Sequence, residues 1–194
     1  MAIKPSGVKY SELKAADIPI LSLADGQPLE GKARPSSDTP THLVLYRAFP
    51  KIGGVVHTHS TFATSWAQAA CDVPLWGTTH ADSMNVPVPC TDFMEDDRIS
   101  GDYEIETGNQ IVSTFAVRKL NPDEVQMVLA AGHGPFTWGK TGESALNHAE
   151  LLEELCKMAF LTKMLRPDNP PLKQTLVRKH YERKHGANAY YGQR

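Results

Sequence analysis

Two histidines in the segment GGVVHTHSTFATSW, residues 53–66, are spaced so that they could bind one metal ion. His57 and His59 follow an apolar pair and are separated by one residue. If VVHTH, residues 55–59, forms a strand, both imidazoles project from the same face and can reach a common ligand. A half-exposed strand with alternating polar residues would show the same pattern, so the spacing alone leaves both interpretations open.

A third imidazole would make a metal site, and His133 is the best candidate for it. AAGHGPF, residues 130–136, places His133 at the end of an apolar run between two glycines, which allow backbone and ligand to approach closely. A histidine that only caps a loop is the alternative. His80, in TTHADS, is a fourth imidazole, and it lies close to Asp82 in the sequence.

Three neutral histidines with an open coordination position form a Lewis acid, which can activate water or polarise a carbonyl. The HxHxDH pattern of one large hydrolase class fails after His59, and the HExxH helix of zinc peptidases is absent. Carbonyl polarisation is therefore the better use of a metal here. It requires acid–base groups, which Asp38 and Asp82 could supply.

Two further polar clusters have both a chemical and a structural interpretation. Ser37 and Asp38 could serve the site or could cap a helix. Lys4, Ser6 and the backbone of Gly7, in IKPSG, could grip a phosphate or form an ordinary turn.

The elements that must position these residues alternate between helix and strand. Breakers and β-branched residues favour a strand at 55–59, and the apolar run 125–136 is typical of a buried strand that leads into a loop. Apolar spacing predicts helices at 36–49, 60–70, 107–120, 143–165 and 172–186. Ser37 or Asp38 would cap the first of them, which has Pro40 in its first turn, and Ser60 would cap the second. We predict an α/β fold in which helices cover a sheet.

The longest predicted helix, 143–165, carries an apolar stripe that should pack against the sheet. The stripe repeats every three or four residues and comprises Leu151, Leu155, Met158, Leu161 and Leu165. Pro167 lies just past the end of the helix, and Gly186 is expected to end the last one.

Length and composition limit the class of protein. The 194 residues suit one domain, and no apolar run approaches the roughly 18 residues needed to span a membrane. A formal charge of −2 gives no reason to expect a nucleic-acid partner. The first residues, MAIKPSGVKY, show no apolar h-region of the kind found in secretory signals, and the three cysteines form no CxxC pair. We therefore expect buried free cysteines and a cytoplasmic protein.

Several segments, taken together and in order, resemble the L-ribulose-5-phosphate 4-epimerases of the class II aldolase superfamily. They are IKPSGV, RPSSDTPTHLVLYRAFPKIGGVVHTHS, WGTTHAD, VPCT, GDYEIETGN, GHGPFTWGK and KHYERKHGANAYYGQ. The resemblance covers essentially the whole chain. HAD and HGANAYYGQ are typical of the epimerases rather than of the fuculose- or rhamnulose-phosphate aldolases. The resemblance implies a three-layer α/β/α domain, residues 1–194, with a central mixed, mostly antiparallel sheet.

The resemblance also implies the site. His57, His59 and His133 would bind Zn²⁺ or another divalent transition metal such as Mn²⁺ or Co²⁺, with Asp38 as a further ligand or a base. Asp82 and Tyr191 would be the acid–base pair, and His180 would assist them. Contacts to the substrate and its phosphate would come from Lys4, Ser6, Gly7, Ser36 and Ser37.

By the same resemblance, the reaction would be epimerisation of L-ribulose 5-phosphate at C4 through cleavage and re-formation of the C3–C4 bond. The sites would lie between subunits of a homotetramer, with Asp82 and Tyr191 supplied by a neighbour. The family pattern includes an N-terminal helix and a Gly-Asn loop, which we expect this chain to lack. A sugar-phosphate aldolase and an inactive oligomerisation or binding module are the alternatives.

Overall fold

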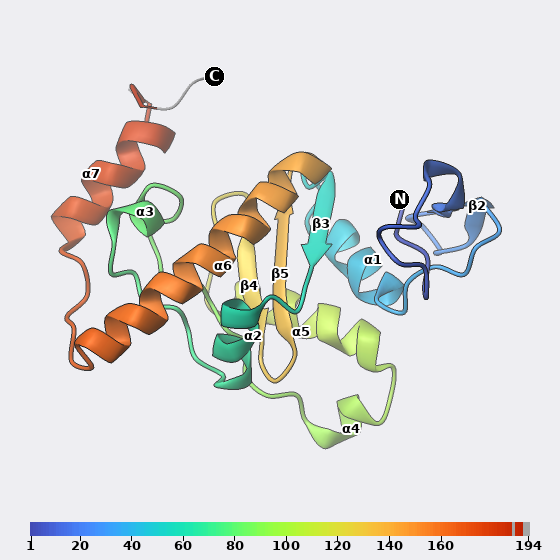
Figure 1. The fold of residues 1–194 in the computed structure, drawn as a ribbon, viewed down its shortest axis with the longest axis horizontal. Coiled ribbons are helices and arrows are strands. Elements are labelled where there is room, and N and C mark those ends of the chain that lie inside the picture. The colour runs from blue at the N-terminus through green and yellow to red at the C-terminus, as the bar shows by residue number, and fades with distance from the viewer. Residues whose placement is uncertain (188, 192–194) are drawn as a thin grey trace. The chain divides into compact units, whose positions relative to one another are not determined.

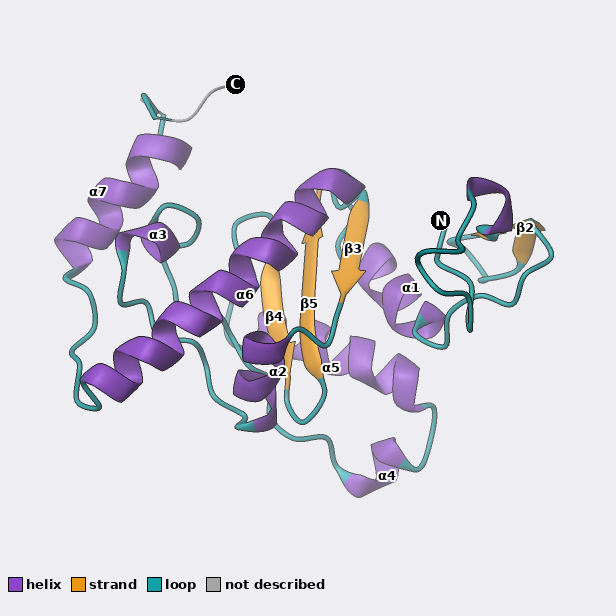
Figure 2. Ribbon diagram, in the orientation of Figure 1, coloured by secondary structure: helices purple, strands orange, loops and turns teal. Residues whose placement is uncertain are grey.

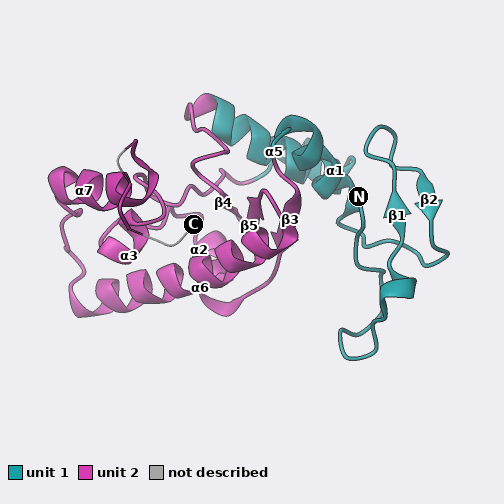
Figure 3. Ribbon diagram, turned by 90° about the horizontal axis from the view of Figure 1, so that it is seen from above, with its two compact units in different colours: residues 1–51, 94–116 teal, residues 52–93, 117–194 magenta. Residues whose placement is uncertain are grey.

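The computed structural model describes residues 1–187 and 189–191 and divides the chain into two compact units. Unit 1 comprises Met1–Lys51 and Met94–Ala116, and unit 2 comprises Ile52–Phe93 and Val117–Arg194 (Figure 3). A single domain spanning the whole chain stays a prediction.

Unit 1 is built around helices α1 (Thr39–Ala48) and α5 (Tyr103–Val117). The first begins as predicted, with Asp38 in the N-cap position and a proline in the first turn. α5 begins four residues earlier than the predicted 107–120. The two helices pack closely, since a Cβ added at Gly108 would lie 2.7 Å from Val44 Cβ. Unit 1 also contains η1 (Ala15–Asp17), β1 (Ile20–Leu21), β2 (Pro28–Glu30) and α4 (Asp96–Ile99).

Unit 2 contains a three-stranded antiparallel sheet in the order β3-β5-β4, shown in orange in Figure 2. Its strands are β3 (Gly54–His57), β4 (Met127–Ala130) and β5 (Gly134–Gly139). The predicted strand at 125–136 is therefore two strands of a hairpin. Every residue of β4 and β5 is buried, which explains why the apolar run continues across the turn.

Helix α6 (Gly142–Leu165) packs against all three strands and against α2 (Thr61–Gln68). It starts with a capping box in which the Thr141 hydroxyl accepts a hydrogen bond from the Ser144 N–H. The two remaining helices, α3 (Thr78–Ala81) and α7 (Gln174–His185), pack against each other. The last helix ends at Gly186, as predicted.

The predicted apolar stripe of α6 is wrong in its C-terminal half. Leu155 is buried, whereas the exposed fractions of Met158, Leu161 and Leu165 are 41%, 48% and 88%. Figure 1 shows the reason, because this half of the helix extends beyond the strands. Small side chains contribute to the buried face instead, which comprises Ala145, Leu152, Leu155, Cys156 and Ala159.

The predicted α/β class with a mostly antiparallel sheet is confirmed. The named strands pair antiparallel, and a single-residue parallel bridge joins Cys90 to Leu129. All three cysteines are free, but only Cys90 and Cys156 are buried; Cys71 is exposed because it follows the end of α2. In the part of the chain that is described, every helix is too short or too polar to cross a membrane.

Candidate active site

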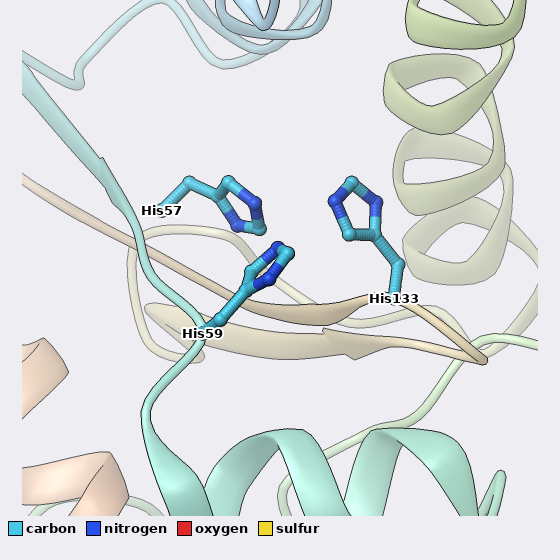
Figure 4. A group of neighbouring side chains, drawn as sticks. All are labelled: His57, His59 and His133. Carbon is cyan, nitrogen blue, oxygen red and sulfur yellow. The ribbon is translucent and has the colours of Figure 1, made fainter.

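The imidazoles of His57, His59 and His133 converge from two separate segments (Figure 4). One ring nitrogen from each lies within 4.8 Å of the others. The ring centroids are 5.0 Å apart for His57 and His59, 4.7 Å for His57 and His133, and 5.2 Å for His59 and His133. The structure therefore brings the three predicted metal ligands together.

His57 is fixed by the strand that faces it. Its Nδ1 lies 2.9 Å from the carbonyl oxygen of Pro135, and its ring stacks on Phe136 with centroids 4.1 Å apart. Because a carbonyl can only accept a hydrogen bond, Nδ1 must carry the hydrogen. In that tautomer Nε2 carries the lone pair that can bind a metal, which is the usual arrangement for a ligating histidine.

His59 lies outside the strand, so the prediction of a strand across residues 55–59 is wrong. β3 ends at His57, which pairs with Phe136. The next residue of the partner strand is Pro135, which has no N–H to continue the ladder. The chain leaves the sheet at that point, and His59 reaches the other two rings from the segment that leads into α2.

His133 lies in the turn between β4 and β5, and the glycines on either side have separate roles. Gly132 has φ +71°, a left-handed conformation that suits glycine. At Gly134, an added Cβ would lie 3.0 Å from the Thr58 carbonyl oxygen and 3.3 Å from Cδ2 of His59. The absence of a side chain at this position therefore leaves room for the imidazoles.

The predicted substrate residues belong to unit 1, where two segments lie side by side. Pro5 pairs with Pro35, the Ser36 N–H donates to the Lys4 carbonyl at 3.0 Å, and the Ser6 N–H donates to the Arg34 carbonyl at 2.8 Å. Gly7 turns the chain with φ +73°. This pairing gathers all the predicted substrate contacts, namely Lys4, Ser6, Gly7, Ser36 and Ser37.

Asp38 occupies the N-cap position of α1, but its side chain makes no capping hydrogen bond. Its carboxylate accepts instead from the Ser36 hydroxyl at 3.3 Å. A role of the carboxylate as a helix cap is thereby excluded, although the backbone position was predicted correctly. Whether it binds metal or acts as a base stays a prediction.

Asp82 lies at the end of α3, at the centre of a charged cluster formed with α7. His180 Nδ1 donates to Oδ1 at 3.0 Å, and Arg183 donates from Nε to Oδ1 at 3.0 Å and from Nη2 to Oδ2 at 2.8 Å. His185 Nε2 donates to the Asp82 backbone carbonyl at 2.9 Å. Burial favours a higher pKa for Asp82, but the hydrogen bonds from Arg183 and His180 outweigh it and lower that pKa.

Tyr191 joins the same cluster. Its ring lies over the Arg183 guanidinium, with Cζ 4.2 Å from the ring centroid, and its N–H donates to the Arg183 carbonyl at 3.0 Å. The tail beyond α7 therefore brings Tyr191 to Arg183, the residue that also binds the Asp82 carboxylate. Figure 1 shows α3 and α7 beside one another and to one side of the sheet.

His80, the fourth candidate imidazole, is not part of either group. It is 3% exposed, and its Nε2 donates to the Val86 carbonyl at 3.0 Å. Burial lowers the pKa of His80 to about 4, so the ring is neutral near pH 7. It is a core histidine, and its proximity to Asp82 in the sequence reflects the short helix α3.

The protein family follows from a comparison with known proteins. The family model described as "Class II Aldolase and Adducin N-terminal domain" matches residues 1–160. The chain belongs to this family. Sequence similarity extends to its C-terminus, beyond the residues that the family model matches, as the individual relatives show.

Two relatives within the class II aldolase family are named L-ribulose-5-phosphate 4-epimerase UlaF. Those of Salmonella paratyphi A and Salmonella paratyphi C are 44% and 45% identical over 194 residues, which is 100% of this chain and 84% of each relative. Among solved structures, an L-fuculose 1-phosphate aldolase matches with a TM-score of 0.74 and 23% identity, covering 94% of this chain and 78% of that one. The last match supports the fold.

The donors in this class II aldolase chain fit a metal ion. The triad offers neutral nitrogen ligands, Nδ1 of His57 is already occupied by a backbone carbonyl, and Gly134 leaves the rings unobstructed. Imidazole suits zinc and other divalent transition metals. Three protein ligands leave a coordination position for a substrate oxygen, as in catalytic zinc sites.

Sequence reasoning missed Arg183. It lies in VRKHYERKH, residues 177–185, whose three basic residues in the last turn suit a helix C-terminus. His180 and Arg183 are three residues apart, so they lie on one face of α7. That spacing was the available signal, but only the packing of α3 against α7 shows that this face meets a carboxylate.

Proposed function

We propose that this chain is a metal-dependent L-ribulose-5-phosphate 4-epimerase that forms D-xylulose 5-phosphate. The observation that carries the proposal is the meeting of Asp82, His180 and Tyr191 around Arg183. An acid–base pair of this kind is what an epimerase needs in addition to a metal site. The identity of 44% and 45% to two proteins named as such epimerases supports the same substrate.

The reaction inverts C4 without loss or gain of atoms. As the C3–C4 bond breaks, its electron pair stays with C3, and the proton of the C4 hydroxyl passes to a base. The resulting aldehyde turns its other face to C3, the bond re-forms, and the C4 oxygen takes a proton from an acid. Each face therefore needs one proton-carrying group close to the C4 oxygen.

Asp82 and Tyr191 are the groups that we assign to the two faces. Arg183 keeps Asp82 ionised and lies against the Tyr191 ring, so it holds a proton acceptor and a phenol in one place. His180, hydrogen-bonded to the same carboxylate, can relay the proton. A bound ion would polarise the C2 carbonyl and so stabilise the negative charge that the electron pair leaves on C3.

The remaining assignments follow the same proposal. His57, His59 and His133 hold the ion, which we propose to be zinc or a similar divalent metal, and Asp38 acts as a further ligand or base. The paired segments of unit 1 bind the substrate and its phosphate through Lys4, Ser6, Gly7, Ser36 and Ser37. A cytoplasmic location agrees with the free cysteines.

We also propose that neighbouring subunits of a homotetramer share each site. This assignment accounts for the position of Asp82, which lies in the α3–α7 pair, whereas the triad lies at the end of β3 and in the turn before β5. It predicts complementation: mixed, reassembled Asp82→Asn and His57→Asn subunits should recover activity that neither variant has alone. Failure to recover any activity would place both groups in sites of a single chain.

The function is tested by the products formed from L-ribulose 5-phosphate. We expect D-xylulose 5-phosphate from the metal-loaded protein. For Tyr191→Phe we expect a rate that is lower by roughly 100-fold or more, the usual effect of losing an acid–base group. Accumulation of dihydroxyacetone and glycolaldehyde phosphate without xylulose 5-phosphate would indicate an aldolase. No turnover at all would favour an inactive binding module.

A further inference from the structure

Helix α2 begins two residues after the proposed metal ligand His59, and its first turn is capped by a residue from another helix. Ser60 occupies the N-cap position but makes no side-chain capping bond. The N–H groups of Phe62 and Ala63 donate instead to Oε1 and Oε2 of Glu153, each at 2.9 Å. One carboxylate from α6 thus satisfies two of the N–H groups that a helix start leaves without a partner in the helix.

This cap matters because the N-cap residue of α2 makes no capping bond of its own. The helix has 8 residues and no acidic side chain in its first turn, and helices of that length are unstable in isolation. α6 has 24 residues and packs against all three strands of the sheet, whereas α2 packs against β4, β5 and α6. A second bond, from Trp66 Nε1 to the Cys156 carbonyl at 3.0 Å, ties the next turn of α2 to the same helix.

Of the three metal ligands, His59 has the weakest support from the sheet. His57 is held by the β3–β5 ladder and by Pro135, and the N–H of His133 donates to the Ala130 carbonyl within the hairpin turn. His59 lies beyond the end of β3, one residue before Ser60, and it is the exposed member of the triad. Its backbone leads directly into Ser60, the N-cap residue of α2.

We propose that Glu153 is a positioning residue for the metal centre, which holds the start of α2 and thereby keeps His59 within reach of His57 and His133. The Glu153 carboxylate is not itself a metal ligand, because its two oxygens accept hydrogen bonds from α2. The inference rests on the metal site of the proposed function, but not on the reaction or the substrate. Metal binding, rather than turnover, is therefore the property that should change.

The test is the affinity of the purified full-length protein for Zn²⁺, measured by competition with a chromophoric chelator, together with the visible spectrum of the Co²⁺-loaded form. Glu153→Ala should weaken Zn²⁺ binding roughly 10- to 100-fold, the effect of losing an outer-shell partner, and should alter the cobalt spectrum. Glu153→Gln, which keeps one acceptor oxygen, should lose less. Glu154→Gln, at an exposed neighbour on the same helix, is the matched control and should leave both unchanged.

A double-mutant cycle separates this role from general destabilisation. In a His59→Ala background, Glu153→Gln should cause no further loss of affinity, because the ligand that it positions is gone. Equal losses in both backgrounds would overturn the proposal, as would wild-type affinity and an unchanged cobalt spectrum in folded Glu153→Ala. If the wild-type protein binds no Zn²⁺, the metal centre fails as well; if it binds while Glu153 has no effect, only the present inference fails.

Discussion

Arg183 holds Asp82 through two parallel hydrogen bonds, from Nε to Oδ1 at 3.0 Å and from Nη2 to Oδ2 at 2.8 Å. The side chains are only 22% and 14% exposed, so solvent screens this pair weakly. The geometry makes Arg183 the residue that keeps the carboxylate ionised and correctly oriented.

Replacing Arg183 by Met should therefore alter the pH dependence of the reaction. The pKa of Asp82 is lowered by Arg183 and His180, so without the guanidinium it rises, and protonation inactivates the base at a higher pH. The acidic limb of the kcat/KM profile should move upward in pH. The rate at neutral pH should fall roughly 10- to 100-fold, since the base loses two charge-assisted hydrogen bonds that hold it ionised and oriented.

Two further substitutions control this prediction. Arg183→Lys keeps the charge but not the paired donors, so it should restore part of the profile and little of the rate. Arg178→Met removes an exposed charge from the same helix and should change neither. An Arg183→Met protein with a wild-type pH profile would show that the guanidinium does not act through Asp82.

Gly134→Ala tests the space beside the triad. Its Cβ would lie 3.0 Å from the Thr58 carbonyl oxygen and 3.3 Å from His59 Cδ2, so the metal-ligand segment must shift. We expect weaker Zn²⁺ binding and a lower free energy of unfolding, by about 1–3 kcal/mol for an overpacked site. Isothermal calorimetry and chemical denaturation measure the two effects.

Gly142→Ala is the matched control, because an added Cβ there meets nothing within 4 Å and the residue starts α6. The same chemical change should be neutral or stabilise the protein by about 0.4–1 kcal/mol. Equal behaviour of the two variants would contradict the packing argument at Gly134.

Burial of His80 should make the stability depend on pH between 4 and the ordinary histidine value. The pKa of His80 is lowered to about 4, so below pH 6.5 the unfolded chain binds a proton that the folded chain does not. Stability from this residue is complete above pH 6.5 and is lost progressively as the pH falls toward 4. The loss amounts to roughly 3 kcal/mol at about 1.36 kcal/mol per unit.

The check on His80 compares chemical denaturation of the metal-free wild type and His80→Gln across this pH range. Gln can still donate to the Val86 carbonyl but does not titrate. The variant should lose less stability between pH 6.5 and 4. Parallel curves for the two proteins would mean that the pKa of His80 is the same in the folded and the unfolded chain.

Much of the metal centre was predictable from local sequence, because His57 ends a strand, His59 follows it by two residues and His133 lies in a glycine-flanked turn. The strand boundary was not, since it depends on Pro135, which faces the chain from 77 residues beyond Thr58 and cannot continue the ladder. His59 reaches the triad through the start of α2, and its support by Glu153 is a contact across 90 residues or more.

The acid–base cluster illustrates the same limit. Residue types alone give Tyr191 no catalytic role, and only the resemblance to the epimerases assigns it one. Arg183 could be placed on one helix face from its spacing, but its partner Asp82 is 101 residues away in the sequence. Similarly, the apolar stripe of α6 did not reveal that the sheet stops short of Met158. Periodicity shows which face of a helix is apolar but not how far along the helix that face is covered.

The central claim is that this protein inverts C4 of L-ribulose 5-phosphate with the help of a metal held by the three histidines. The most direct measurement follows the sugar phosphates by NMR after incubation of L-ribulose 5-phosphate with the Zn²⁺-loaded protein, with and without prior chelation. We predict that D-xylulose 5-phosphate accumulates to equilibrium with the metal and fails to form after chelation, and that formation resumes when Zn²⁺ is restored. Xylulose 5-phosphate formed at the same rate by the chelated protein, or never formed by the loaded one, would contradict the account.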